Sequence, residues 1–125
     1  MIKMVFCVKR LSIIPEDDFY KYWLEKHGPL VKSKANDMGI RRYVQSHTKR
    51  KEMGEAVSSA RGMQQKGFDG VAEVWWDSFD AAEAALGSEI GIAASALLGE
   101  DEAKFIDLEA STIFFTEEHE VVSIG

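Results

Sequence analysis

His27 is the side chain in this sequence best suited to moving a proton near neutral pH. It follows Phe19 and Trp23 at intervals of four residues, so a helix through this stretch would place all three on one inward-facing stripe. Imidazole has the ordinary pKa closest to neutrality, which makes His27 a candidate general acid or base. The alternative is a structural histidine, either bonded to a backbone carbonyl in the core or favoured by the dipole at a helix C-terminus.

A second group of polar side chains follows in a predicted strand. Tyr43, Gln45 and His47 alternate along this strand and therefore share one of its faces. We expect them to line the same cavity as His27, with Gln45 and His47 binding a polar substituent of a ligand. The alternative for His47 is a strand end that is exposed to water and has no role.

Glu73 and Trp75 are further candidates, because both lie in a predicted interior strand. Glu73 would act as a base with a raised pKa or would orient an imidazole. The alternative for Glu73 is an ion pair with Arg41 or Arg42. Trp75 is expected to form a stacking wall of the cavity together with Trp23, and plain core packing is the alternative for both indoles.

The sequence contains no pattern typical of a metal or cofactor site. The histidines and Glu73 lack the i, i+3 or i, i+4 spacing of metal ligands on a helix, and no HExxH, CxxC, GxGxxG, Walker or GxSxG motif occurs. We therefore expect no bound metal and no cofactor, and either cofactor-independent proton transfer or ligand binding alone. The alternative from another functional class is a haem-binding accessory protein with His27 as the axial ligand.

The composition indicates one domain spanning residues 1–125. The chain is 46% hydrophobic and 29% charged, which provides enough apolar material for one core. Fifteen Lys and Arg against 21 Asp and Glu give a formal charge of −6, which disfavours nucleic acid and acidic membrane surfaces as partners. The chain has a single cysteine, Cys7, no signal-peptide pattern and no apolar run long enough to span a bilayer. We therefore expect a cytoplasmic protein with no membrane partner.

Hydrophobic periodicity predicts alternating strands and helices. Gly28 and Pro29 predict a break after the first helix, since glycine ends helices and the residue before proline avoids the helical conformation. Residues 49–69 show no sustained period, so we expect a lid, a partner surface or a mobile loop there, with a short helix at 52–60. Residues 118–124 are expected to form an edge strand or a tail. The predicted strands cover residues 2–9, 40–48, 71–77 and 111–115, and the predicted helices cover residues 15–27, 30–38, 81–86 and 90–98.

This order of elements is that of the ferredoxin-like α+β fold. In that fold, βαββαβ, a four-stranded antiparallel sheet carries both helical segments on one face. The other face is then bare. One of Trp75 and Trp76, and one of Phe114 and Phe115, must point towards it, which would expose a large apolar patch to water. We therefore expect a homodimer formed through the sheet faces.

Five segments in a fixed order along the chain form a pattern that is more specific than WxxxHGP alone. They are YWLEKHGPL at residues 22–30, YVQSH at 43–47, FDGVAEVW at 68–75, DE at 101–102 with FID at 105–107, and TEEH at 116–119. In this combined order the sequence resembles the EthD family over nearly its whole length. The resemblance places His27 at the motif histidine, and Tyr43, Gln45, His47, Glu73 and Trp75 at matching sheet positions.

The resemblance implies a dimeric α+β barrel, in which two ferredoxin-like sheets pack together, but it does not imply one reaction. The family includes relatives similar to fungal dehydratases and decarboxylases of aromatic polyketides, and related barrels include cofactorless monooxygenases. We therefore expect a small homodimer that binds a hydrophobic aromatic or alicyclic molecule. Dehydration, decarboxylation, isomerisation or oxygenation would make it a lyase, an isomerase or an oxidoreductase in a catabolic or polyketide-type pathway. The alternative is a noncatalytic ligand-binding accessory protein for a partner oxidase.

Overall fold

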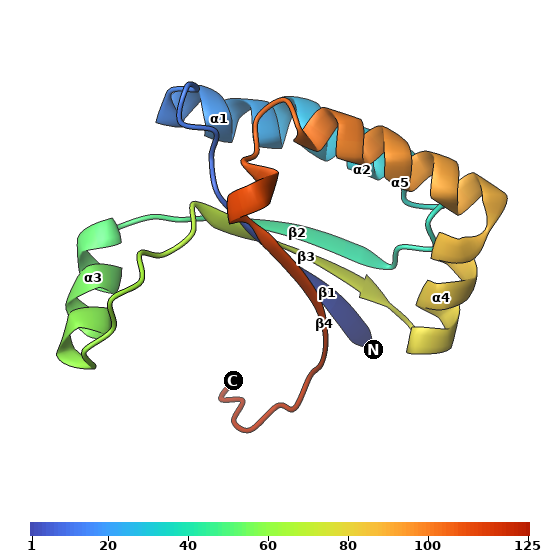
Figure 1. Cartoon of the computed structure of the whole chain (residues 1–125). Coiled ribbons are helices and arrows are strands. Elements are labelled where there is room, and N and C mark those ends of the chain that lie inside the picture. Colours follow the sequence, from blue (N-terminus) through green and yellow to red (C-terminus); the bar gives the residue numbers. More distant parts are fainter.

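The computed structural model describes all 125 residues and contains one four-stranded sheet (Figure 1). The strand order is β2-β3-β1-β4, and each neighbouring pair is antiparallel. The order of strands and helices confirms the ferredoxin-like α+β fold expected from the sequence. The strands are β1 (Ile2–Val8), β2 (Arg42–His47), β3 (Gly70–Trp76) and β4 (Thr112–Glu117).

The helices lie on one face of the sheet, except for α3, which projects away from the body (Figure 1). α4 begins where the Ser78 hydroxyl accepts a hydrogen bond from the Ala81 N–H, and α5 begins where Ser88 does the same for Gly91. No single helix is long and apolar enough to cross a membrane; α4 and α5 reach that length only together and are bent by 83°. The helical segments are α1 (Glu16–Tyr22), the π-helical turn η1 (Trp23–His27), α2 (Gly28–Lys34), α3 (Lys51–Ala60), α4 (Phe79–Gly87), α5 (Glu89–Glu102) and the 3-10 turn η2 (Leu108–Ala110).

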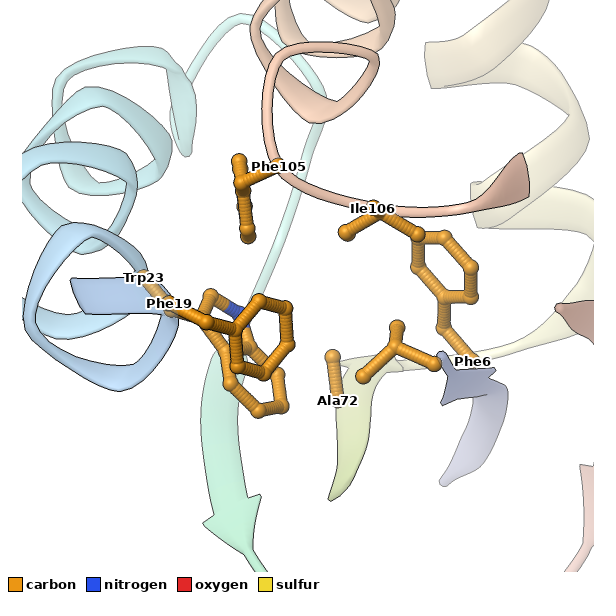
Figure 2. Packing of buried hydrophobic residues seen from close by; sticks show 7 residues of the cluster. Phe6, Phe19, Trp23, Ala72, Phe105 and Ile106 are labelled. Atoms are coloured by element: carbon orange, nitrogen blue, oxygen red, sulfur yellow. The ribbon is translucent and has the colours of Figure 1, made fainter. Parts of the chain in front are cut away.

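The main core cluster joins the first helix to the middle of the sheet (Figure 2). Phe6 and Ala72 rise from β1 and β3, and Phe19 and Trp23 descend onto them from the helix. Gly70 makes this packing possible, because a Cβ atom there would lie 2.6 Å from both the Trp23 ring and the Ser46 carbonyl oxygen. The Trp23 side chain therefore requires a glycine beneath it.

The predicted helix break at Gly28 and Pro29 is wrong. The chain passes from α1 through η1 into α2 with helical backbone angles, and the Gly28 N–H donates to the Trp23 carbonyl five residues earlier. Proline has no N–H to donate, and its ring would clash with a carbonyl in the preceding α-helical turn. The wider π turn accommodates Pro29, and such turns are frequent at functional sites.

No helix packs on the face of the sheet opposite α1, α2 and α5, which we call the open face (Figure 1). Val5, Val44 and Val71 lie on it and are partly exposed, and Phe114 is 47% exposed. Trp75, rather than Trp76, points to this side. The chain after β4 forms a tail and no further strand.

Candidate functional site

A cavity of about 150 Å³ lies between the sheet and the helices. Aromatic and aliphatic side chains form most of its wall, among them Trp23 and Tyr43. Apart from the Tyr43 phenol, the polar or charged side chains in the lining are those of His27, Ser95 and Glu102. An apolar cavity with few convergent polar groups is typical of a small-molecule binding site.

His27 sits at the wall of this cavity in a buried hydrogen-bond chain. The side chain is positioned by η1, and the residue is only 3% exposed. Its Nδ1 lies 2.8 Å from Oδ2 of Asp101, and the Tyr22 hydroxyl donates to the other Asp101 oxygen at 2.5 Å. The alternative of a histidine bonded to a backbone carbonyl is thus not what the structure contains; the partner is a buried carboxylate.

The hydrogen bonds to Asp101 fix which histidine nitrogen carries the proton. Burial raises the pKa of Asp101, but the hydrogen bonds from Tyr22 and His27 outweigh it and leave this pKa below its usual value. The carboxylate is therefore ionised at neutral pH and accepts a hydrogen bond from the Nδ1–H group, which leaves a free electron pair on Nε2. Burial lowers the pKa of His27 despite Asp101, so the imidazole is neutral at pH 7. In this state His27 is equipped to accept a proton.

Glu102 provides the second ionisable group of the cavity. One of its carboxyl oxygens lies 3.6 Å from Nε2 of His27. Burial, aided by the neighbouring charge of Asp101, raises the pKa of Glu102 to about 7. The last turn of a helix disfavours negative charge as well, and both carboxyls stand in the last turn of α5. Glu102 therefore gains and loses its proton near neutral pH, which is the range in which a general acid or base acts.

The polar row on β2 braces the site more than it lines the cavity. The Gln45 amide donates to the Trp23 carbonyl oxygen at 2.8 Å and to the Tyr43 hydroxyl at 3.0 Å, and its oxygen accepts from His47. The His47 ring stacks on Trp23, with centroids 4.7 Å apart, and on Tyr20. Among the three row residues, only Tyr43 borders the cavity. Gln45 and His47 instead hold η1 against the sheet through contacts with Trp23 that lie outside the cavity.

The structure does not bring Glu73 and Trp75 to this cavity. Both side chains lie on the open face, because they alternate with Ala72, Val74 and Trp76, which face the helices. The Glu73 carboxylate pairs with Lys3 at 2.6 Å. The ion-pair alternative for Glu73 is therefore the arrangement observed, although its partner is neither Arg41 nor Arg42. Trp75 packs under Arg42 and donates its indole N–H to Glu118.

The sequence reasoning missed Asp101, Glu102 and Tyr22 as members of the site. A signal for the two carboxyls was present, because the buried side of α5 runs through Ala94 and Leu98 and continues at Asp101. Carboxylates on the apolar side of a helix, at the end where basic residues are favoured, are exceptional. For Tyr22 no such signal exists, since only the fold brings its hydroxyl to Asp101.

An open cleft beside β2 borders the cavity and shares Val31, Ile40 and Tyr43 with its wall. Lys32 and Arg41 lie on the outer part of this cleft, which has no acidic residue in its lining. These shared residues separate the cavity from the cleft.

Comparison with known proteins identifies relatives of the whole fold. The EthD domain model matches residues 14–109. An EthD family protein from Bacillus halodurans is similar at 18% identity with a TM-score of 0.63, covering 95% of this chain and 99% of that chain. A dimeric protein of unknown function with a ferredoxin-like fold, from Bacteroides fragilis, is similar at 10% identity and a TM-score of 0.57, covering 94% and 95%. SnoaB, a cofactor-independent oxygenase from Streptomyces nogalater, is similar at 12% identity and a TM-score of 0.53, covering 97% and 95%. No curated protein matches the sequence significantly.

Proposed function

Because the chain belongs to the EthD family, we propose that it binds a hydrophobic ring-containing molecule in the cavity and moves a proton on it through His27, without a cofactor. One observation carries this proposal: the electron pair of His27 Nε2 and the Glu102 carboxyl meet at the wall of a mostly apolar cavity. The cofactor-independent oxygenase among the similar folds is consistent with chemistry of this kind.

The proposed step is a proton transfer from an acidic C–H or O–H bond of the ligand to Nε2 of His27. The bonding electron pair stays on the ligand, and the imidazole becomes an imidazolium whose positive charge faces the Asp101 carboxylate. Glu102, protonated at and below about pH 7, can return a proton to another atom of the ligand. Dehydration, decarboxylation, isomerisation and oxygenation of an electron-rich phenol can all begin with such a transfer.

The size of the cavity limits the ligand. An apolar cavity of about 150 Å³ holds one benzene-sized ring. A larger polycyclic molecule needs the wall at Val31, Ile40 and Tyr43 to open into the neighbouring cleft. We therefore place a single aromatic or alicyclic ring beside His27 and any remaining part of the molecule in the cleft.

Turnover of a compound panel tests the proposal. The protein is incubated with phenolic, quinone and polyketide-like compounds of increasing ring number, and products are identified by mass spectrometry. For any compound that is converted, His27→Ala is expected to lower turnover by about 10² to 10⁴-fold. The matched control is His119→Ala, because the His119 side chain is 78% exposed and lies outside the site. Undiminished turnover in His27→Ala would remove His27 from the mechanism.

The alternative function is binding without chemistry, on behalf of a partner oxidase. Saturable binding of single-ring compounds with no product from any of them would favour this role over catalysis. A haem-binding version is disfavoured by the cavity, which is sized for one ring and not for a macrocycle. The visible spectrum after haem addition tests that version directly, since axial ligation by His27 would shift and sharpen the haem Soret band and His27→Ala would not.

We further propose that the protein acts as a homodimer joined through the open faces. Val5, Val44, Val71 and Phe114 lie there around the Lys3–Glu73 ion pair, and no helix or strand of the same chain covers them. Water contact with apolar side chains is unfavourable, and a second sheet removes it. The dimeric ferredoxin-like protein among the similar folds is consistent with this arrangement.

A further inference from the structure

Residues 49–66, which we call the arm, contain a helix, α3, that is held by its own chain only at its first residue, Lys51. α3 has ten residues, none of them buried, and it makes no more than marginal contact with the other helices and strands. Met53 and Val57 lie four residues apart on one side of this helix and are both more than half exposed. An isolated helix shorter than about 12 residues is marginal in water, so the apolar side of α3 needs a partner.

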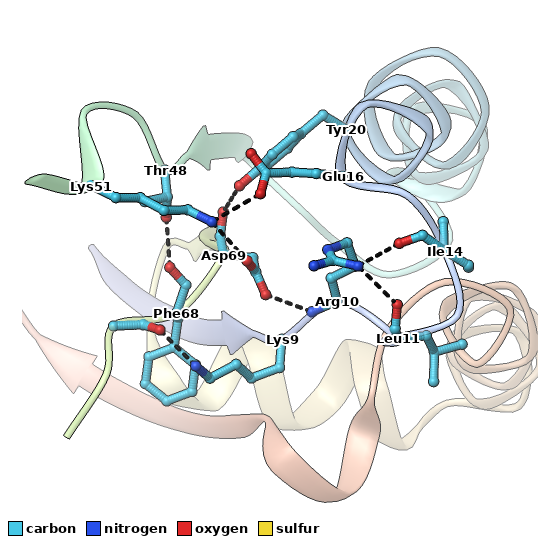
Figure 3. Close-up of polar contacts among 11 residues, drawn as sticks. Lys9, Arg10, Leu11, Ile14, Glu16, Tyr20, Thr48, Lys51, Phe68 and Asp69 are labelled. Atoms are coloured by element: carbon cyan, nitrogen blue, oxygen red, sulfur yellow. Dashed lines mark hydrogen bonds and ion pairs between the residues drawn. The ribbon is translucent and has the colours of Figure 1, made fainter.

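The root of the arm, in contrast, is firmly held (Figure 3). The Thr48 hydroxyl donates to the Phe68 carbonyl oxygen at 2.7 Å, and Lys51 binds the Glu16 carboxylate at 2.9 Å. Asp69 accepts from the Arg10 N–H and donates its own N–H to the Val8 carbonyl oxygen. These contacts join the two ends of the arm to β1 and α1, so the arm is directed away from the body and is not a loose loop.

The arm and the C-terminal segment, residues 117–125, have complementary chemistry. The arm carries five Lys and Arg against two Glu, in a chain whose formal charge is −6. The C-terminal segment carries three Glu and no Lys or Arg. It also exposes Val121, Val122 and Ile124, which gives the apolar side of α3 a matching surface.

Both segments extend from the sheet on the side away from α1, α2 and α5 (Figure 1). Within one chain they leave the sheet at diagonally opposite corners. The arm follows His47, which pairs with Gly70 beside the end of β1 at Val8, whereas Glu117 pairs with Ile2 at the other end of β1. β2 and β4 are moreover the two edges of the sheet. The arm therefore does not meet the C-terminal segment of its own chain.

We propose that the arm of each copy packs on the C-terminal segment of the second copy, with the apolar side of α3 against the exposed valines and isoleucine. This inference rests on the proposed dimer through the open faces. Consider a twofold axis that lies between the two sheets and runs along the diagonal through the other two corners of the sheet. Rotation about this axis places the arm corner of one copy over the C-terminal corner of the other copy. One rotation then forms both contacts, and the strands of the two sheets cross at a steep angle.

Hydrogen exchange of the α3 amides, measured beside the oligomeric state by light scattering, tests the proposal. In the wild-type dimer we expect protected amides in α3. Removal of residues 119–125, or Val57→Asp, is expected to speed their exchange at least about tenfold while the protein stays dimeric, because helices this short fray when unsupported. The matched control is Ile92→Asp on α5, which is exposed to the same 56% as Val57 and should leave α3 exchange unchanged.

The outcomes separate the two proposals. A wild-type dimer whose α3 amides exchange freely overturns the arm contact and leaves the open-face dimer standing. Protection that survives removal of residues 119–125 also overturns it, because α3 would then pack on something else. A wild-type monomer at micromolar concentration overturns the proposed dimer and the arm contact together.

Discussion

Two adjacent carboxyls at the end of α5 differ in protonation state because their neighbours differ. Asp101 receives hydrogen bonds from Tyr22 and His27 and is ionised, while Glu102 receives none of these and has its pKa raised to about 7 by burial. The ionised one orients the imidazole, and the protonated one faces its free nitrogen across 3.6 Å. Environment, not residue type, thus divides the two roles.

Asp101→Asn is expected to impair any reaction that uses His27 while preserving the shape of the site. An amide holds no negative charge, so it stabilises the imidazolium less and can favour the wrong tautomer of the ring. Replacing the orienting carboxylate of a catalytic histidine can cost up to about 10⁴-fold in kcat. We expect a fall in kcat, not a rise in KM, and an acidic limb of the pH profile displaced to lower pH, because the imidazolium loses its proton more readily. The control is Asp80→Asn, on the exposed start of α4; equal kinetics of both variants would contradict the role of Asp101.

Glu102→Gln is expected to stabilise the protein in alkaline solution and not in acid. The unfolded chain loses the Glu102 proton near pH 4.5, whereas the folded protein keeps it to about pH 7. The contribution of Glu102 to the free energy of unfolding therefore falls as the pH rises from 4.5 to 7 and is constant above that range. By this linkage the variant gains up to about 3 kcal/mol at pH 8 and almost nothing at pH 4. Urea unfolding at both pH values measures the difference, with Glu83→Gln on α4 as the control; a gain at pH 4 equal to that at pH 8 would refute the raised pKa.

At this scale the sequence could predict His27 and not its partners. The spacing of Phe19, Trp23 and His27 places the imidazole inside, and the structure agrees. The distance in sequence between His27 and Asp101 is 74 residues, so no local pattern joins them. The alternation that placed Glu73 and Trp75 together was also correct, but the spacing of a strand cannot tell which of its faces carries the cavity.

At the scale of elements, the helix from Glu16 to Lys34 positions the site through its π turn. That turn presents Trp23 to the sheet and His27 to the cavity. The Gln45 amide donates a hydrogen bond to the carbonyl oxygen of Trp23, the first residue of the turn. The sequence rule that glycine and proline end helices failed here because it considers α-helical turns only. A widened turn removes the clash that the rule anticipates, and Pro29 then stands in the first turn of α2, where proline is well tolerated.

Gly70→Ala and Gly54→Ala are expected to change stability in opposite directions. A Cβ at Gly70 would collide with the Trp23 ring and a backbone oxygen, so the indole must move and about 1 to 3 kcal/mol of stability is lost. Gly54 lies in α3 with nothing near its Cβ position, so alanine there gains up to about 1 kcal/mol of helix propensity. Urea unfolding followed by tryptophan fluorescence measures both, and loss of the Trp23 stack on His47 should alter the native spectrum of the first variant only. Equal stability of the two variants would contradict the close packing at Gly70.

For the whole molecule, the sheet order and the uncovered face followed from the order of predicted elements, because few topologies accommodate βαββαβ. Which of Trp75 and Trp76 lies on the open face depends only on which of the two alternating sets of β3 residues faces the helices, and the structure supplies this. The arm was less predictable. Its helix has no partner within the chain, and a helix whose partner is another copy leaves only a weak pattern in one sequence.

Phe114→Arg is expected to separate the proposed dimer without unfolding its protomers. Phe114 lies on the open face, so a charge there must be buried against a second sheet, at a cost far above that of an exposed charge. Phe79 on α4 is exposed to 46%, against 47% for Phe114, and Phe79→Arg is therefore a control of nearly identical solvent contact. Light scattering across micromolar concentrations should find a monomer for the first variant and a dimer for the second. The Tm of a dimer rises with protein concentration and that of a monomer does not, so the Phe114 variant should lose this dependence. If both variants remain dimeric, the copies associate through another surface.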